Sequence, residues 1–280
     1  MRFAKAHGLS NDFVLVEATE APAQPGPWAR RLCDRHVGVG GDGVLLHGVE
    51  GGQATMRLLN ADGTDGEVSG NGVRCLAAYL VSKARLPARH TVLTPPGPRP
   101  VEVQDLGGLR YRVRTDLGPA ILASEAIPVA IDPPQPRVVD HLLEAAGRRV
   151  AVTATSLGNP HCAVFSEEPP DDRSVATLGP ALESHPFFPR RTNVEFVTVL
   201  SRERIRVRFW ERGVGPTRSS GTGAASAAVA AVLSGRVDRR VSVVCDGGVL
   251  EVEWPEAGHV VQMGEVEILF EGDWLARLPG

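Results

Sequence analysis

The chain has 280 residues, of which 42% are hydrophobic and 22% charged, and a formal net charge of −3. This composition is typical of a globular protein with one large domain or two ordinary domains. The paired arginines are scattered, which argues against a nucleic-acid surface. The longest apolar stretch, 224–233, is shorter than the ~18–20 residues that a membrane-spanning helix needs. We therefore expect neither a nucleic-acid partner nor a membrane partner.

The first ten residues lack the apolar segment of a signal peptide, and the four cysteines lie far apart without C-x-x-C spacing. We therefore expect a cytoplasmic location, without a disulfide framework or a zinc site. No metal or organic cofactor is expected, because the chain has no G-x-x-x-x-G-K-[ST] loop and its glycine phrases do not match the dinucleotide spacing.

The predicted elements, taken in chain order, are mostly short strands in which apolar and polar residues alternate. Strands are predicted at 12–17, 54–60, 109–115, 194–200 and 204–210, and helices at 28–36, 71–86, 178–185 and 221–235. The helices at 71–86 and 221–235 are apolar nearly all round, so we expect each to be buried inside a curled sheet. The proline-rich segment 128–140 is typical of a linker or an excursion, and we place a domain boundary near residue 118.

Two copies of one phrase, Ser-Gly-x-Gly, begin these two helices at Ser69 and Ser220. Asn60 precedes the first serine by nine residues, and Glu211 precedes the second by nine. Near the start of each half stands an asparagine before an extended stretch, in "HGLSNDFVLV" and "SLGNPHCAVF". Glycine-rich turns can recur by chance, but three features in the same order favour two half-chains of related topology that face each other across a cleft.

The start of a helix is suited to binding an anion. Its first N–H groups have no intrahelical partner, its dipole is positive there, and glycines allow a ligand to approach the backbone. Serine is also a common N-cap residue, which alone would explain Ser69 and Ser220. Because the phrase occurs twice, each time after a polar turn, we favour a shared ligand site.

Polar side chains near the two phrases match the needs of an amino acid: amides, a carboxylate for an ammonium group and a guanidinium for a carboxylate. Arg212 and Glu211 could instead form a surface pair, although they follow a buried strand. Asn11 could be a simple turn residue. The candidates are Asn60, Asn159, Asn193, Glu211 and Arg212.

Six blocks of this sequence, in order along almost the whole chain, resemble the diaminopimelate epimerase family. They are "FAKAHGLSNDFV" (3–14), "GVGGDGVLL" (38–46), "NADGTDGEVSGNGVRC" (60–75), "GNPHCAVF" (158–165), "TNVEFV" (192–197) and "ERGVGPTRSSGTGAA" (211–225). Proline-racemase-like enzymes usually have His where Asn71 stands, and the phenazine-biosynthesis type relies on a single carboxylate without the paired phrases.

The resemblance implies an α+β fold of two pseudo-symmetric domains, each a mostly antiparallel curled sheet around a central helix. The domains would be 1–118, completed by a C-terminal strand at about 264–280, and 119–263. The implied activity is pyridoxal-independent interconversion of LL- and meso-diaminopimelate, in the lysine and peptidoglycan precursor pathway, by a homodimer whose substrate lies between the helix starts. The implied site consists of catalytic Ser69 and Ser220 and substrate-binding Asn11, Asn60, Gly70, Asn71, Asn159, Asn193, Glu211, Arg212, Gly221 and Thr222.

The chain departs from the family at both catalytic positions. There the family has cysteines that exchange the α-proton as two bases, whereas this chain has Ser69 and Ser220, and Cys75 and Cys162 are not expected to replace them. A thiol has a reference pKa of about 8.5, whereas a hydroxyl is far less acidic and is poorly matched to base catalysis without a helper. Candidate helpers are Glu67 and His161.

Three explanations of the double serine remain open. It can be an engineered substrate trap, a natural branch with altered chemistry such as elimination or a different isomerisation, or an amino-acid-binding pseudo-enzyme. Pro216 supports divergence, because the family usually has an acidic residue there. In each case we expect substrate binding to survive, because serine keeps the size and hydrogen bonding of the side chain. We expect epimerase activity to be much reduced.

Overall fold

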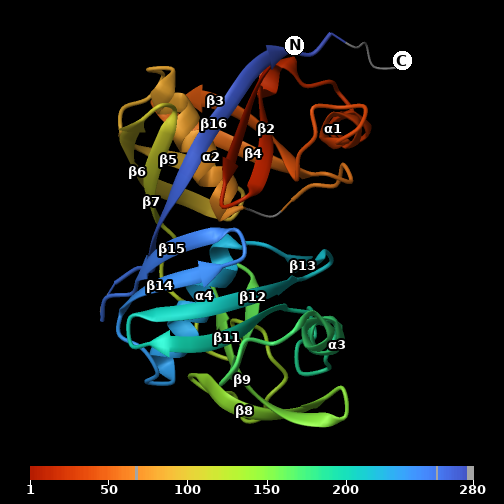
Figure 1. Ribbon diagram of the computed structural model, residues 1–280, viewed down its shortest axis with the longest axis vertical. Helices are drawn as coiled ribbons and strands as arrows, with labels where there is room; N and C mark the ends of the chain where they lie inside the picture. The colour runs from red at the N-terminus through yellow and green to blue at the C-terminus, as the bar shows by residue number, and fades with distance from the viewer. Residues whose placement is uncertain (67–68, 257, 276–280) are drawn as a thin grey trace. The chain divides into compact units, whose positions relative to one another are not determined.

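The computed structural model describes residues 1–66, 69–256 and 258–275. The chain divides into two compact units. Unit 1 consists of Met1–Asp116 and the chain from Met263 onward, and unit 2 is Leu117–Gln262. We describe each unit by itself (Figure 1).

Unit 1 is a closed barrel. Within the described residues, its eight strands follow one another as β1-β2-β3-β4-β5-β6-β7-β16, and β16 pairs again with β1. Most neighbours are antiparallel, but β2–β3 and β4–β5 are parallel. The strands are β1 (Arg2–Gly8), β2 (Asn11–Glu17), β3 (Gly43–Glu50), β4 (Gln53–Asn60), β5 (Arg89–Thr94), β6 (Gly97–Gly107), β7 (Arg110–Asp116) and β16 (Val261–Asp273).

Helix α2 (Gly70–Ser82) runs through the middle of this barrel and contacts all of β1–β7. Its side chains, including Val73, Leu76 and Leu80, are buried among inward-facing strand residues. The prediction of a buried helix inside a curled sheet is therefore confirmed. Helix α1 (Pro25–Cys33), which follows the short 3₁₀ helix η1 (Ala18–Glu20), covers the outer face of the barrel.

Unit 2 repeats this plan as a curled sheet around α4 (Gly221–Leu233), which contacts β9–β12, β14 and β15. The strand order is β8-β9-β10-β11-β12-β14-β15, with β13 paired to β12, and α3 (Asp172–Glu183) packs on the outside. The strands are β8 (Val138–Ala145), β9 (Arg148–Ser156), β10 (Pro160–Ser166), β11 (Asn193–Ser201), β12 (Arg204–Glu211), β13 (Gly215–Thr217), β14 (Arg240–Cys245) and β15 (Gly248–Glu253).

The two units share one topology. The order β1-β2-α1-β3-β4-α2-β5-β6 in unit 1 corresponds to β9-β10-α3-β11-β12-α4-β14-β15 in unit 2. The parallel pairs also correspond, because β2–β3 matches β10–β11 and β4–β5 matches β12–β14. This correspondence confirms the expected pseudo-symmetric α+β fold.

Some predicted boundaries are wrong. The helix predicted at 28–36 begins earlier, because Pro25 occupies the first turn, where proline is tolerated, and it ends at Cys33. The helix predicted at 178–185 begins at Asp172, where an exposed polar turn gives no apolar period and Asp171 caps the helix by accepting the Ser174 N–H at 2.8 Å. The segment 128–140 is not a free linker, because Val129 is buried in the core of unit 2 and β8 begins at Val138.

Candidate functional site

Ser69 is the N-cap of α2. Its Oγ accepts the N–H of Gly72 at 3.1 Å, as expected of a serine at this position. The bond uses an oxygen lone pair and leaves the hydroxyl hydrogen available for another partner. A Cβ at Gly72 would lie 3.1 Å from Leu45 Cδ2 and 3.3 Å from Ser69 Cβ, so glycine fits this turn best.

Ser220 occupies the equivalent position at the start of α4. Its Oγ accepts the N–H of Gly223 at 3.3 Å, and the serine is 6% exposed. A Cβ at Gly223 would lie 3.0 Å from both Ser220 Oγ and Glu195 Oε1. The second glycine of each phrase therefore allows the capping serine, and in unit 2 also a carboxylate, to approach the helix.

Asn11 follows the tight turn between β1 and β2. Leu9 and Ser10, the central residues of this turn, have φ of 56° and 65°, as in the turns that favour two-residue hairpins. The turn brings Asn11 next to α2, where its Oδ1 accepts a hydrogen bond from Asn71 Nδ2 at 3.2 Å. Unit 1 thus gathers Asn11, Gly70 and Asn71 around the start of α2.

Asn60 has a different local role. Its Nδ2 donates to Thr64 Oγ1 at 3.0 Å, and its N–H donates to the Thr64 carbonyl at 2.8 Å. These bonds close the turn that follows β4. Glu67, the proposed helper of Ser69, lies outside the described residues.

Glu211 is the last residue of β12, and its carboxyl group interacts with the Ser220 hydroxyl. Burial raises the pKa of Glu211, and interactions with the Thr217 and Ser220 hydroxyls and with His161 offset part of this effect. A carboxylate whose pKa moves towards neutrality is a better general base than an ordinary glutamate. The interaction with Ser220 gives that hydroxyl a group able to accept its proton.

His161 joins two further polar residues in unit 2. Its Nδ1 lies 2.7 Å from Glu195 Oε1, and its Nε2 lies 2.9 Å from Asn159 Oδ1. Burial raises the pKa of Glu195, while the charge and hydrogen bond of His161 act in the opposite direction. Asn159 is therefore connected through His161 to the buried carboxylate of Glu195.

Asn193 and Arg212 are held by the backbone. Asn193 Nδ2 donates to the Pro160 carbonyl at 3.0 Å, and its Oδ1 accepts the Arg212 N–H at 2.9 Å. Arg212 Nη1 donates to the Arg190 carbonyl at 3.1 Å. Asn193 thus connects Arg212, at the end of β12, to Pro160, at the start of β10.

Apart from Asn60, which closes its own turn, the predicted residues form two sets, one in each unit. Around Ser69 lie Asn11, Gly70 and Asn71, and the set of Ser220 consists of Asn159, Asn193, Glu211, Arg212, Gly221 and Thr222. Sequence reasoning missed three hydrogen-bonding partners of the predicted residues. Asp42 Oδ2 accepts Asn11 Nδ2 at 2.7 Å, Arg74 Nη2 donates to Asn71 Oδ1, and Glu195 lies beside His161. A signal existed for the last two, since Arg74 is a charged residue in an otherwise apolar helix and Glu195 interrupts a buried strand.

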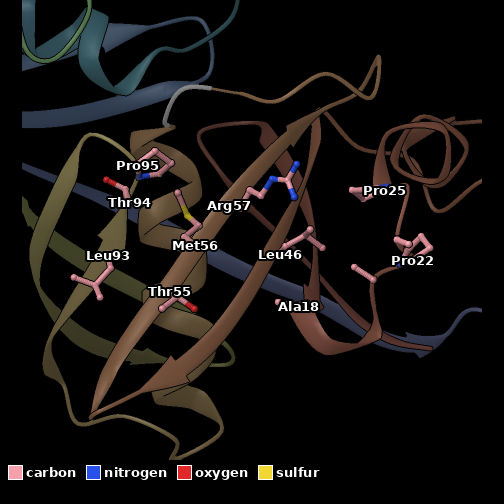
Figure 2. A pocket seen from close by; sticks show the side chains of 12 residues that line it. Ala18, Pro22, Pro25, Leu46, Thr55, Met56, Arg57, Leu93, Thr94 and Pro95 are labelled. Carbon is pink, nitrogen blue, oxygen red and sulfur yellow. The ribbon is translucent and has the colours of Figure 1, made fainter.

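Other features of the described residues lie apart from these two sets. A surface hollow of about 460 Å³ in unit 1 lies beside β4, β5 and the start of α1, and none of the predicted site residues lines it (Figure 2). Cys75 is fully buried in the core of unit 1, so a substrate cannot reach its thiol. In the part of the chain that the structure describes, no cluster of His, Cys, Asp and Glu could hold a metal, and no helix is long and apolar enough to cross a membrane.

The family model for diaminopimelate epimerase matches residues 3–123 and 153–269. The chain belongs to this family. It is 48% identical over 294 residues to the diaminopimelate epimerase of Desulforudis audaxviator, covering 98% of this chain and 99% of the relative. It is 43% identical over 282 residues to the diaminopimelate epimerase of Pelotomaculum thermopropionicum, covering 99% and 100%.

A solved structure shows the same fold at much lower identity. The hydroxyproline epimerase of Agrobacterium vitis, with bound trans-4-hydroxy-L-proline, aligns with a TM-score of 0.70 and 14% identity, over 97% of this chain and 90% of that one. Family membership makes this chain an enzyme of the cofactor-independent racemase and epimerase class, with diaminopimelate epimerases of lysine biosynthesis as its relatives.

Proposed function

We propose that the chain interconverts LL- and meso-diaminopimelate by two-base exchange of the α-proton, with Ser69 and Ser220 in the two base positions and a much reduced rate. The observation that carries the proposal is the equivalence of the two serines. Each caps the central helix of one unit, and the two units repeat one topology.

In the proposed reaction Ser220 Oγ takes the α-proton as its own hydroxyl proton passes to the Glu211 carboxylate. The Cα–H bond breaks, and the electron pair of that bond is delocalised into the α-carboxylate. Ser69 then donates its hydroxyl proton to Cα from the opposite face and is left as an alkoxide. The proton held by Glu211 returns through water to Ser69, and the reverse reaction runs through the same steps in the opposite order. No cofactor takes part.

The slow rate follows from the acidity of a hydroxyl. Each pKa unit that must be overcome to form the base costs about 1.4 kcal/mol. A thiol at a helix start would be ionised far more readily. We therefore expect the serine enzyme to bind substrate normally through the remaining polar residues, and to turn it over slowly. A homodimer in the cytoplasm is the expected state by resemblance.

The test is exchange of the substrate α-proton in D₂O, followed by NMR for each diaminopimelate isomer. We expect slow exchange in the chain with its two serines and a rate at least about a hundredfold higher in the double variant Ser69→Cys/Ser220→Cys, since a matched general base contributes about 10²–10⁴-fold. The matched control is Ser82→Cys/Ser234→Cys, at the opposite ends of the same helices. A double-cysteine variant no faster than the natural chain would refute the two-base assignment.

The serines favour a second candidate, a protein that binds the amino acid without epimerising it, or that carries out a different isomerisation or elimination. Calorimetry distinguishes it. Binding of a diaminopimelate isomer without α-proton exchange would favour a binding protein. Binding of another amino acid, with no heat from either isomer, would indicate a divergent branch.

A further inference from the structure

A buried carboxylate at the end of α3 binds the chain on both sides of Glu211. Glu183 is the last residue of this helix, which lies on the outside of unit 2 against β12 and β13 (Figure 1), and it is 5% exposed. Its Oε2 accepts the Trp210 Nε1–H at 2.7 Å, and its Oε1 accepts the Gly213 N–H at 2.7 Å. Trp210 directly precedes Glu211, and Gly213 follows two residues after it. One side chain therefore anchors both ends of the segment that carries Glu211.

The turn after Glu211 is held mainly from outside. Within the turn, the Val214 N–H donates to the Glu211 carbonyl at 3.0 Å, and Gly213 has φ of 78°. Val214 is 74% exposed, so this end of the turn faces solvent. On the inner side, Asn193 Oδ1 accepts the Arg212 N–H at 2.9 Å, and Glu183 accepts the N–H that follows. The backbone that carries the Glu211 side chain is thus fixed by two side chains from other elements.

Glu183 is itself held in place. Arg191 Nη2 donates to Glu183 Oε1, and the Glu183 carbonyl accepts the Thr192 N–H at 3.1 Å. One helical turn before Glu183, Gly179 lies against the Trp210 ring. A Cβ at Gly179 would lie 2.4 Å from Trp210 Cδ2, so glycine allows the helix to approach the indole closely. The position of the carboxylate relative to β12 is therefore set by backbone bonds, by a cation and by ring packing.

We propose that Glu183 is a positioning residue, which keeps the Glu211 carboxyl beside the Ser220 hydroxyl by fixing the chain on both sides of Glu211. This inference rests on the proposed function, in which Glu211 takes the Ser220 proton. The Glu211 carboxyl interacts with the Ser220 hydroxyl, and a hydrogen bond weakens steeply when its atoms move out of line. Release of Trp210 and Gly213 would allow the end of β12 to move, so proton transfer between the two groups would slow.

The first test is the rate of α-proton exchange in D₂O, followed by NMR. Glu183→Gln keeps the size of the side chain but has one acceptor oxygen in place of two, so its NH₂ group meets one of the two donors. We expect exchange to slow about tenfold to a hundredfold, as for a small misplacement of a catalytic group. In a Glu211→Gln background the further loss should be no more than about twofold, because Glu183 acts through Glu211. Trp210→Phe removes the donor on one side only and should slow exchange less than Glu183→Gln does.

The control is Leu182→Ala, which removes a core side chain from the same turn of α3. This variant should be less stable, but it keeps the Glu183 carboxylate, so its exchange rate should be unchanged at a temperature at which it is folded. An equal loss of rate in Leu182→Ala and Glu183→Gln would indicate a merely structural role. That result, an equal loss in both backgrounds, or no loss from Glu183→Gln would overturn the proposal.

The second test needs no ligand. In ¹³C-labelled protein, the carboxyl signal of Glu211, assigned by its absence in Glu211→Gln, reports the titration of this group. Its midpoint should lie above the ordinary value of about 4.3 in the unsubstituted chain and in Leu182→Ala, and should move towards that value in Glu183→Gln as the carboxyl becomes less buried. An unchanged midpoint in Glu183→Gln would overturn the proposal. If the unsubstituted chain exchanges no α-proton but the midpoint moves in Glu183→Gln, the proposed function fails while the positioning of Glu211 stands.

Discussion

His161 Nδ1 lies 2.7 Å from Glu195 Oε1 inside unit 2, and each side chain is 1% exposed. A buried pair of this kind is strongly destabilised when one partner is removed, because the other is left without compensation. Glu195→Ala should therefore lower the free energy of unfolding by about 3 kcal/mol. Glu195→Gln retains a hydrogen-bonding partner and should lower it by about 1 kcal/mol. Denaturant titration measures both, and equal losses would show that the hydrogen bond retained by glutamine does not contribute to stability.

The close approach at Gly223 gives a second prediction. Alanine here would place a methyl carbon 3.0 Å from Ser220 Oγ and Glu195 Oε1, so the serine and the carboxylate must both move. We expect Gly223→Ala to lower the free energy of unfolding by about 1–3 kcal/mol, as for overpacking, and to abolish α-proton exchange. Gly72→Ala is the matched variant in unit 1 and should cost less, because its nearest neighbour is the end of the Leu45 side chain. A fully active Gly223→Ala enzyme would contradict this reading.

The raised pKa of Glu211 predicts how stability depends on pH. The folded chain holds the proton of this carboxyl to a higher pH than the unfolded chain, whose carboxyl titrates near pH 4.3. Stability should therefore fall as pH rises from about 4.3 through the folded pKa, and it should stay reduced above it. Glu211→Gln removes the free-energy cost of ionising this buried carboxyl, so the variant should melt at a higher temperature at pH 7 than the unsubstituted chain. It should also exchange the α-proton more slowly. Melting curves between pH 4 and 8 test the sign, and a variant that melts at a lower temperature at pH 7 would contradict it.

The pKa of Asp12 is lowered rather than raised, so its effect on stability changes with pH in the opposite direction. Burial alone would raise the pKa of Asp12, but hydrogen bonds from Arg35 and Lys5, at side-chain exposures of 56% and 6%, hold it well below its ordinary value. This carboxylate therefore stabilises the fold fully above about pH 4, and the stabilisation is lost as pH falls towards the folded pKa. Asp12→Ala should lower the free energy of unfolding at pH 7 by about 3 kcal/mol, because it leaves the buried Lys5 ammonium without its carboxylate partner.

The control for this prediction is Asp65→Ala, which removes an exposed partner of Arg57 and should cost less than about 1 kcal/mol. Denaturant titration at pH 7 and pH 3 compares the two variants. If Asp12→Ala were no more destabilising than Asp65→Ala, or if its loss were larger at pH 3 than at pH 7, the pKa argument would be wrong.

Local chemistry made some of the structure predictable. The two central helices are apolar nearly all round, which favours a buried position. Ser-Gly-x-Gly combines an N-cap with glycines at both helix starts. The first turn of α3 was missed because its residues are exposed and polar, so that Asp171 is the main signal of the helix start.

The hydrogen bonds that hold the residues of the candidate site join positions far apart in the sequence, so local chemistry does not predict them. Asn71 and Asn11 are 60 residues apart, and Asn11 and Asp42 are 31 apart. No periodicity connects such positions, and only the folded barrel brings them together. The residues expected to bind substrate could therefore be named from the sequence, whereas the hydrogen bonds of Asn11 to Asp42 and of Asn71 to Arg74 required the structure.

The pairing of β1 with β16 joins the two ends of the chain, from Arg2 opposite Asp273 to His7 opposite Glu267. During synthesis on the ribosome, β1 can pair with β2 early, but its pairing with β16 must wait until Asp273 has been made. The segment 117–262 is continuous and has no such wait. The second half of the chain can therefore complete its fold before the first, the reverse of the usual N-terminal-first order.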